Sequence, residues 1–178
     1  MITAYVEINL DRLNEFRSRV EAELKGSRKG PIHDAFIQWG ARYRAYVSRR
    51  FKNYSRGGSD GTSPRWKPLK HPRKHGRGKY KKASVLIDTG VLWASLSATE
   101  VKPGFKQRRV AYGLNVGFGG PHRHPKGKAT IADIGTFHHF GKGRLPQRKI
   151  IVKPPKKVQR QMRDDLQRGI DRLLDAGN

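Results

Sequence analysis

Apolar residues recur at three- and four-residue steps in three parts of the chain. These steps predict amphipathic helices from Leu10 to Leu24, from about Pro31 to about Lys52, and from Pro155 toward the C-terminus. A first helical turn accepts proline readily, which agrees with a start of the second helix at Pro31. The period of that helix carries Arg50 or Phe51 onto its apolar face, while its second half becomes increasingly basic.

Alternating apolar and polar residues predict short strands elsewhere. Residues 5–8, 97–101 and 150–152 each fit a strand of a few residues. Residues 108–118 alternate cleanly, so we expect one longer strand there with one face on a core. A turn at Pro103-Gly104 would join this strand to the one before it.

Two shorter helices and two loops complete the predicted outline. One helix begins near Gly90, and another covers residues 130–141 and ends at a glycine. Residues 53–82 are rich in glycine, proline, lysine and arginine and poor in aliphatic side chains. We therefore expect a long loop there, pinned to the core by Trp66. Residues 119–128 form a second basic loop.

These elements predict an α+β fold, with a small antiparallel sheet packed with N-terminal, central and C-terminal helices and with long basic loops. The 178 residues are the size of a single domain. Its parts are an N-terminal strand and two helices (1–52), a basic Gly/Pro-rich loop (53–82), a sheet-forming core (83–153) and a C-terminal helix (154–178). The sequence lacks an apolar run of membrane-spanning length and a signal-peptide pattern at its start, so we expect a soluble protein made in the cytoplasm.

The charge of the chain is large and unevenly distributed. Lysine and arginine total 39 against 14 acidic residues, a formal net charge of +25. Between Arg42 and Lys82 there are fifteen basic residues and one acidic residue, Asp60. Such a density repels itself, so this segment is expected to face a polyanion, an acidic protein surface or solvent.

Patterns typical of catalysis and metal binding are weak. The absence of cysteine excludes disulfides and thiolate metal sites. The residues His122, His124, His138 and His139, with Asp133 between them, match no established zinc spacing. The central carboxylates are not paired at a short spacing, and the Gly-x-Ser-x-Gly and phosphate-loop patterns are missing. We expect no enzymatic activity, no cofactor and no metal.

Four short segments between residues 66 and 148 occur in an order known from one family. They are Trp66-Lys-Pro68-Leu69, Leu86-Ile-Asp88-Thr89-Gly90-Val-Leu92-Trp-Ala-Ser95-Leu96, His138-His139-Phe140-Gly141 and Leu145-Pro146-Gln-Arg148. In this order the chain resembles the tail-completion and neck proteins of tailed bacteriophages, the phage virion morphogenesis family, over about residues 62–152. We interpret the matching residues first as fold determinants, with Arg148 able to pair with a carboxylate of the same or the next subunit.

The resemblance implies a non-enzymatic structural protein of the virion neck. Members of the family form rings at the junction between the capsid portal and the tail, around the channel through which DNA passes. We therefore expect a homo-oligomeric ring, a hexamer, with portal-side and tail-side virion proteins as partners and genomic DNA in the channel. The role within the neck could be that of a tail terminator, a head-closure protein or a neck spacer.

The chain departs from the family pattern in its basic segments. It has a Lys/Arg-rich insertion at residues 70–82 and a second basic loop at residues 122–128. These loops would face DNA or acidic patches on neighbouring proteins. The basic residues expected to do so are Arg73, Lys74, Arg77, Lys79, Lys81, Lys82, Arg123, Lys126 and Lys128.

Two alternatives stay open from the sequence. The first is a small basic protein that binds nucleic acid without reading its sequence, which would show affinity falling steeply with salt. The second is a metallonuclease that depends on histidine, for which His138 and His139 would be the candidate residues.

Overall fold

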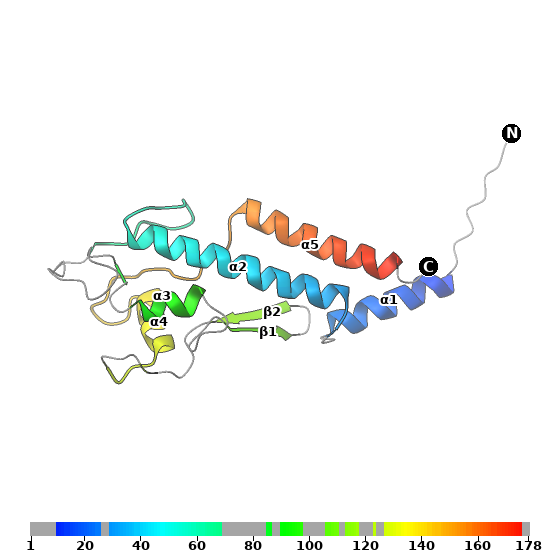
Figure 1. Cartoon of the computed structure of the whole chain (residues 1–178), viewed down its shortest axis with the longest axis horizontal. Coiled ribbons are helices and arrows are strands. Elements are labelled where there is room, and N and C mark those ends of the chain that lie inside the picture. The colour runs from blue at the N-terminus through cyan, green and yellow to red at the C-terminus, as the bar shows by residue number, and fades with distance from the viewer. Residues whose placement is uncertain are drawn as a thin grey trace.

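The computed structural model describes residues 10–25, 29–68, 85–86, 90–97, 106–110, 113–117, 123 and 127–175. Within these ranges the chain is mostly helical (Figure 1). The five helices are α1 (Leu10–Leu24), α2 (Pro31–Ser55), α3 (Val91–Ser97), α4 (Ile131–Phe140) and α5 (Lys156–Asp175). Two short strands, β1 (Lys106–Val110) and β2 (Gly113–Gly117), pair antiparallel. None of these helices combines the length and the apolar character needed to cross a membrane.

The long helix α2 and the C-terminal helix α5 run antiparallel, side by side, and form the frame of the molecule (Figure 1). Gly169 of α5 lies so close to the start of α2 that a Cβ atom there would be 2.9 Å from the carbonyl oxygen of Pro31. Further along, Arg42 Nη2 donates to Asp165 Oδ1 at 3.1 Å, and the Asp165 side chain is fully buried. These contacts fix the two helices against each other at two points.

The start of α2 is stabilised by a residue of α1. The Glu23 carboxylate accepts a hydrogen bond from the backbone N–H of Ile32 at 2.8 Å. The first N–H groups of a helix have no partner within the helix, so a carboxylate at this point is favourable for both hydrogen bonding and charge. Gly30, which precedes the helix at φ 117°, supplies no side-chain cap.

The apolar face of α2 organises the core. Its second half buries Tyr43, Tyr46, Val47, Phe51 and Tyr54 in one cluster, and its first half packs against Leu173 of α5 in another. The prediction of this helix is confirmed, although its end lies at Ser55 rather than near Lys52. Tyr54 continues the buried face three residues after Phe51, and its burial explains the longer helix.

The β structure is smaller than the sequence predicts. The single strand expected over residues 108–118 is wrong, because two strands pair with each other, with Lys106 opposite Gly117 and Val110 opposite Gly113. Leu114 and Val116 do turn one face of β2 to the core. The strand expected at residues 97–101 is wrong at Ser97, which ends α3, and its remaining residues, like the strand expected at 5–8, lie outside the described residues.

The strand expected at residues 150–152 is also wrong. This segment pairs with no described strand, and the backbone N–H groups of Ile150 and Ile151 donate instead to Nδ1 of His139, at 3.1 and 3.4 Å. A side chain thus takes the hydrogen bonds that a strand would have used for pairing.

Candidate functional site

Helix α4 and the turn that follows it carry the third motif of the sequence. Thr130 begins the helix with a capping box, in which its hydroxyl accepts from Asp133 N at 3.0 Å and the Asp133 carboxylate accepts from Thr130 N at 3.1 Å. These hydrogen bonds lower the pKa of Asp133. Gly141 ends the helix at φ 71°, as predicted, and a Cβ there would lie 3.0 Å from Gln147 N.

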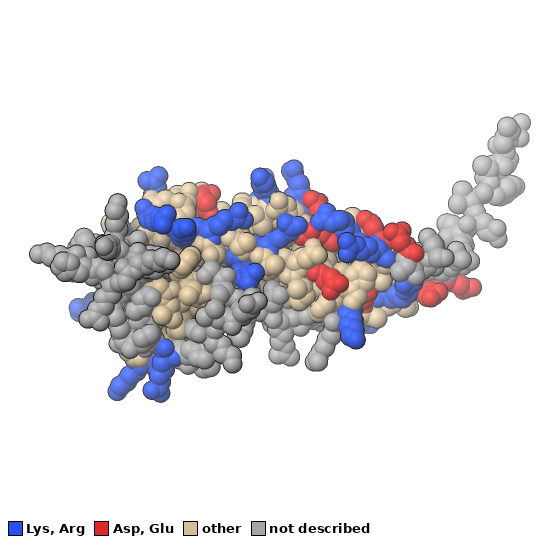
Figure 2. Space-filling view, viewed as in Figure 1, with Lys and Arg blue, Asp and Glu red and all other residues tan. Residues whose placement is uncertain are grey.

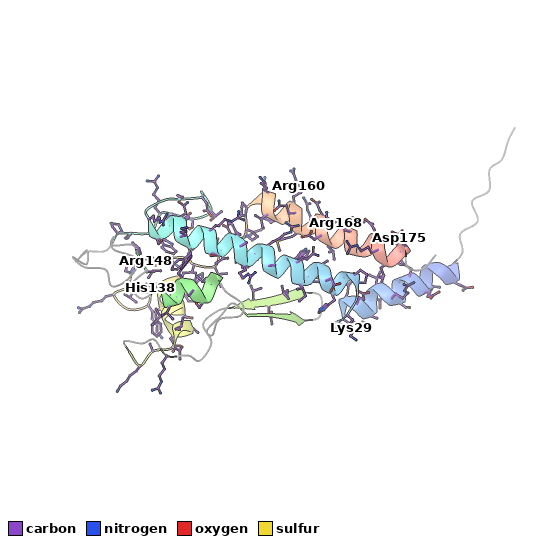
Figure 3. The ribbon with its side chains drawn as sticks, in the orientation of Figure 1. Lys29, His138, Arg148, Arg160, Arg168 and Asp175 are labelled. Atoms are coloured by element: carbon purple, nitrogen blue, oxygen red, sulfur yellow. The ribbon has the colours of Figure 1, made fainter. Side chains whose placement is uncertain are left out.

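Arg148 links this turn to the segment around Trp66. Only 3% of Arg148 is exposed, and its Nη2 donates to the carbonyl oxygen of Lys67 at 3.1 Å. Its backbone N–H donates to the carbonyl oxygen of His138 at 2.7 Å, and its Nη1 lies 3.3 Å from His138 Nδ1. Figure 3 shows the two labelled side chains at the same end of the molecule. Three of the four sequence motifs therefore meet at one buried guanidinium.

No carboxylate of the described residues pairs with Arg148, and pairing with a carboxylate of the next subunit stays a prediction. Within the described residues its partners are a backbone carbonyl and a histidine ring, and its Nε atom is buried without a hydrogen bond. Burial lowers the pKa of Arg148, and burial together with the nearby guanidinium lowers the pKa of His138 to about 4. His138 is therefore neutral at pH 7, and its Nδ1 can accept a hydrogen bond from Arg148.

Trp66 anchors the preceding loop segment in the core, as predicted. It is 4% exposed, and its ring lies edge-on to Phe51 with centroids 5.2 Å apart and beside Tyr54 at 5.6 Å. Pro68 is exposed at the end of this described segment. Leu69 lies outside the described residues.

Helix α3 contributes the second motif to the same cluster. Leu92 is 6% exposed, while Ser95 and Leu96 are completely buried. The Ser95 hydroxyl donates to the carbonyl oxygen of Leu92 at 2.7 Å, which satisfies it within the helix. Gly90 has φ 77° immediately before the helix. The expected turn residues Asp88 and Thr89 lie outside the described residues.

The two histidines of α4 have structural partners. His139 accepts the two backbone hydrogen bonds described above, and burial lowers its pKa. Among the described residues no group of three or more His, Asp and Glu side chains is placed to hold a metal ion. His122 and His124 lie outside those residues.

A buried arginine in α2 was missed by the sequence analysis. The Arg50 side chain has no exposed area, and its guanidinium lies 4.1 Å from the Tyr54 ring centroid. Its Nη1 donates to the carbonyl oxygen of Lys149 at 2.6 Å, and its Nε donates to Thr62 Oγ1 at 3.2 Å. The signal was present in the helical period, which carries Arg50 or Phe51 onto the apolar face; the structure places both there.

Asp60 provides the negative charge nearest to Arg50, at 3.5 Å from its Nε. The Asp60 carboxylate accepts from the hydroxyls of Tyr54 at 2.7 Å, Tyr46 at 3.0 Å and Thr62 at 2.6 Å. Burial alone would raise the pKa of Asp60, but these hydrogen bonds lower it to about 2. The network folds residues 59–63 back onto the end of α2.

The outside of this cluster is apolar at two positions. Phe140, at the end of α4, is 70% exposed, and Leu145 in the following turn is 40% exposed. Lys142 and Arg144 lie between them and are exposed. Exposed large apolar side chains such as Phe140 and Leu145 are typical of protein contact surfaces.

On another part of the molecule, α2, β2 and residues 151–154 line a shallow apolar groove of about 440 Å³.

The basic loop residues fall mostly outside the described part of the chain. Arg123 and Lys128 are described, and both are exposed. The other expected basic residues lie outside it, namely Arg73, Lys74, Arg77, Lys79, Lys81, Lys82 and Lys126.

Comparison of the chain with protein-family models, with curated proteins and with solved structures finds no match.

Proposed function

We propose that this protein is a non-enzymatic subunit of a bacteriophage neck, a head–tail connector or tail-completion protein, which forms a homo-oligomeric ring around the DNA channel. The observation that carries the proposal is the meeting of the four sequence motifs in one packed unit. Trp66, Leu92 and Ser95 are buried together in the core, and Arg148 ties the Trp66 segment to the end of α4.

The contacts explain why these residue types occur in these motifs. Gly141 occupies a left-handed turn in which a Cβ would lie only 3.0 Å from Gln147 N, and His139 supplies an acceptor for two backbone N–H groups. Arg148 supplies two donors to residues far apart in the sequence. The motif residues therefore act mainly by shaping the subunit, which is what a structural virion protein needs from them.

The motifs also place an apolar contact surface outside the core. Phe140 belongs to the third motif, yet it is exposed while its neighbour His139 is half-buried. Leu145 begins the fourth motif and is exposed as well. A ring of identical subunits needs such a surface on each copy, buried only after assembly. We propose that Phe140 and Leu145 lie at the contact between subunits.

Native mass spectrometry of the purified full chain and electron microscopy of the particles test the proposal. We expect a closed ring of six subunits and the presence of the protein in purified virions. Phe140→Ser should shift the distribution toward monomers without lowering the melting temperature, whereas the matched surface change Lys142→Ser should leave the ring intact. A monomer at tens of micromolar that is missing from virions would contradict the neck proposal. Metal-dependent cleavage of DNA by the purified protein would contradict its non-enzymatic character.

A further inference from the structure

Charge is polarised along the long axis of the molecule. Nine of the eleven described carboxylates lie on α1, on the first turn of α2 and on α5 from Asp164 onward. They are Asp11, Glu15, Glu21, Glu23, Asp34, Asp164, Asp165, Asp171 and Asp175. Figure 2 shows acidic side chains mainly toward the α1 end, where basic side chains lie among them, and further basic side chains toward the other end.

The opposite part of the α2–α5 frame carries a set of exposed cations that we call the basic ridge. It consists of the exposed basic residues at and just after the end of α2 and those on the first half of α5. They are Arg49, Lys52, Arg56, Lys156, Lys157, Arg160 and Arg163. None of them forms an ion pair with another described residue, in contrast to Arg42 and Arg50 deeper in the frame. Figure 3 shows Arg160 at the start of α5.

The ridge is unfavourable for the chain itself. Lys156 and Lys157 occupy the first turn of α5, which has no acidic residue. The start of a helix carries a partial positive charge, so cations there destabilise the helix. Repulsion among like charges on the same part of the surface adds to this cost. An external anion would remove both penalties.

The acidic end of a second copy is a poor source of that anion. Glu21 already pairs with Arg17 and Lys25, and the pKa of Glu21 is lowered by these contacts. Asp165 is fully buried and bound by Arg42 and Arg168. Glu21 and Asp165 are therefore neutralised by their own chain, whereas a polyphosphate offers a dense row of unpaired charges.

We propose that the basic ridge binds the phosphate backbone of duplex nucleic acid without reading its sequence. The ridge consists of lysine and arginine only, and the described aromatic residues of the adjoining part of α2 (Tyr43, Tyr46, Phe51 and Tyr54) are buried in the core. This arrangement lacks the exposed rings on which single-stranded bases stack, and it favours contact with phosphates along a duplex. The inference stands without the neck proposal; within that proposal it names the surface that faces the channel.

The expected strength follows from counterion release. If five of the seven cations each neutralise one phosphate, the slope of log K against log salt is about −4.5, and affinity falls about 500-fold between 50 and 200 mM salt. Removing three of the five should weaken the slope by about 2.7.

Fluorescence anisotropy with two labelled duplexes of unrelated sequence, measured on the full chain over a range of salt, tests the proposal. The ridge variant combines Lys52→Gln, Lys157→Gln and Arg160→Gln. The control variant combines Arg17→Gln, Lys25→Gln and Arg172→Gln, which removes the same charge from exposed positions at the other end. We expect the ridge variant to lose at least tenfold in affinity at 100 mM salt and to show the weaker slope. The control should change less than threefold, and both variants should melt near the parent temperature.

Three outcomes would overturn the ridge proposal. One is an equal loss in both variants, which would mean that total charge alone matters. Another is unchanged binding by the ridge variant. The third is competition by polyglutamate as effective as that by unlabelled duplex at equal charge, which would point to an acidic protein as the partner. A ring that still assembles and enters virions in any of these cases would leave the neck proposal standing. A monomer that binds the duplexes as expected would contradict the neck proposal and support the ridge proposal.

Discussion

The guanidinium of Arg148 donates a hydrogen bond to the backbone carbonyl of Lys67 at 3.1 Å, across 81 residues of sequence. This contact connects the segment anchored by Trp66 to the turn after α4. Because Arg148 is buried and its neighbours are a carbonyl oxygen and a neutral histidine, its positive charge is held by dipoles rather than by a described carboxylate.

Replacing Arg148 should therefore destabilise the fold strongly. Arg148→Ala removes a buried hydrogen bond from a charged donor, leaves the Lys67 carbonyl without it and opens a cavity, so we expect a loss of about 3 kcal/mol. Urea unfolding followed by circular dichroism measures this loss. The exposed Arg144→Ala serves as a control and should change stability by less than about 0.5 kcal/mol. Similar midpoints for the two variants would contradict the linking role of Arg148.

Trp66→Ala should cost about 3–5 kcal/mol, because it empties a site that is packed on two sides by aromatic rings. Trp66→Phe keeps most of the packing and should cost clearly less. Thermal melting of both variants provides the comparison. An unchanged melting temperature for Trp66→Ala would show that the segment is not anchored by this ring.

Stability should decrease as the pH falls from about 6.5 to about 4. His138 has a pKa of about 4 in the folded chain, so the unfolded chain binds its proton first over this range. His138→Gln should reduce the slope of the unfolding midpoint against pH, and His139, whose pKa is also lowered by burial, accounts for part of what remains. Protonation of Asp60 lowers the stability further only at lower pH, because the pKa of Asp60 is about 2. A wild-type midpoint that is constant between pH 7 and pH 4.5 would rule out a neutral, buried His138.

Substituting two glycines of one turn separates the cost of backbone strain from the cost of steric crowding. Gly141 and Gly143 have φ of 71° and 67°, but a Cβ at Gly141 would lie 3.0 Å from Gln147 N, whereas a Cβ at Gly143 meets nothing within 4 Å. Gly143→Ala should cost about 1 kcal/mol from strain alone. Gly141→Ala should cost more, because the turn must also move away from residue 147. Equal costs in chemical denaturation would argue against the close approach.

The helices of this protein could be predicted from local patterns, and the contacts of its buried charges could not. The apolar period of α2 and the glycine at the end of α4 act within a few residues, so they are visible in the sequence. Residues 150–152 look like a strand because Ile150 and Ile151 are β-branched, yet their N–H groups are taken by His139, which no local pattern reveals.

The burial of Arg50 illustrates the same limit of local patterns. Arg49 and Lys52 lie close to it in the sequence, and composition alone suggests a solvated face. Its burial depends on Thr62 and Lys149, which arrive from a loop and from a distant segment. The motif pattern did not indicate that Arg148 would bond to a carbonyl oxygen either.

The missing side chain at Gly169 has an effect far from its own position. Since this glycine allows α5 to touch the first turn of α2, it helps to set how the two helices lie against each other. The cations of the basic ridge lie on the opposite parts of the same two helices. A bulkier residue at 169 would push α5 away from the first turn of α2. The spacing of the positive charges at the far end of the molecule would then change although none of the charged residues is replaced.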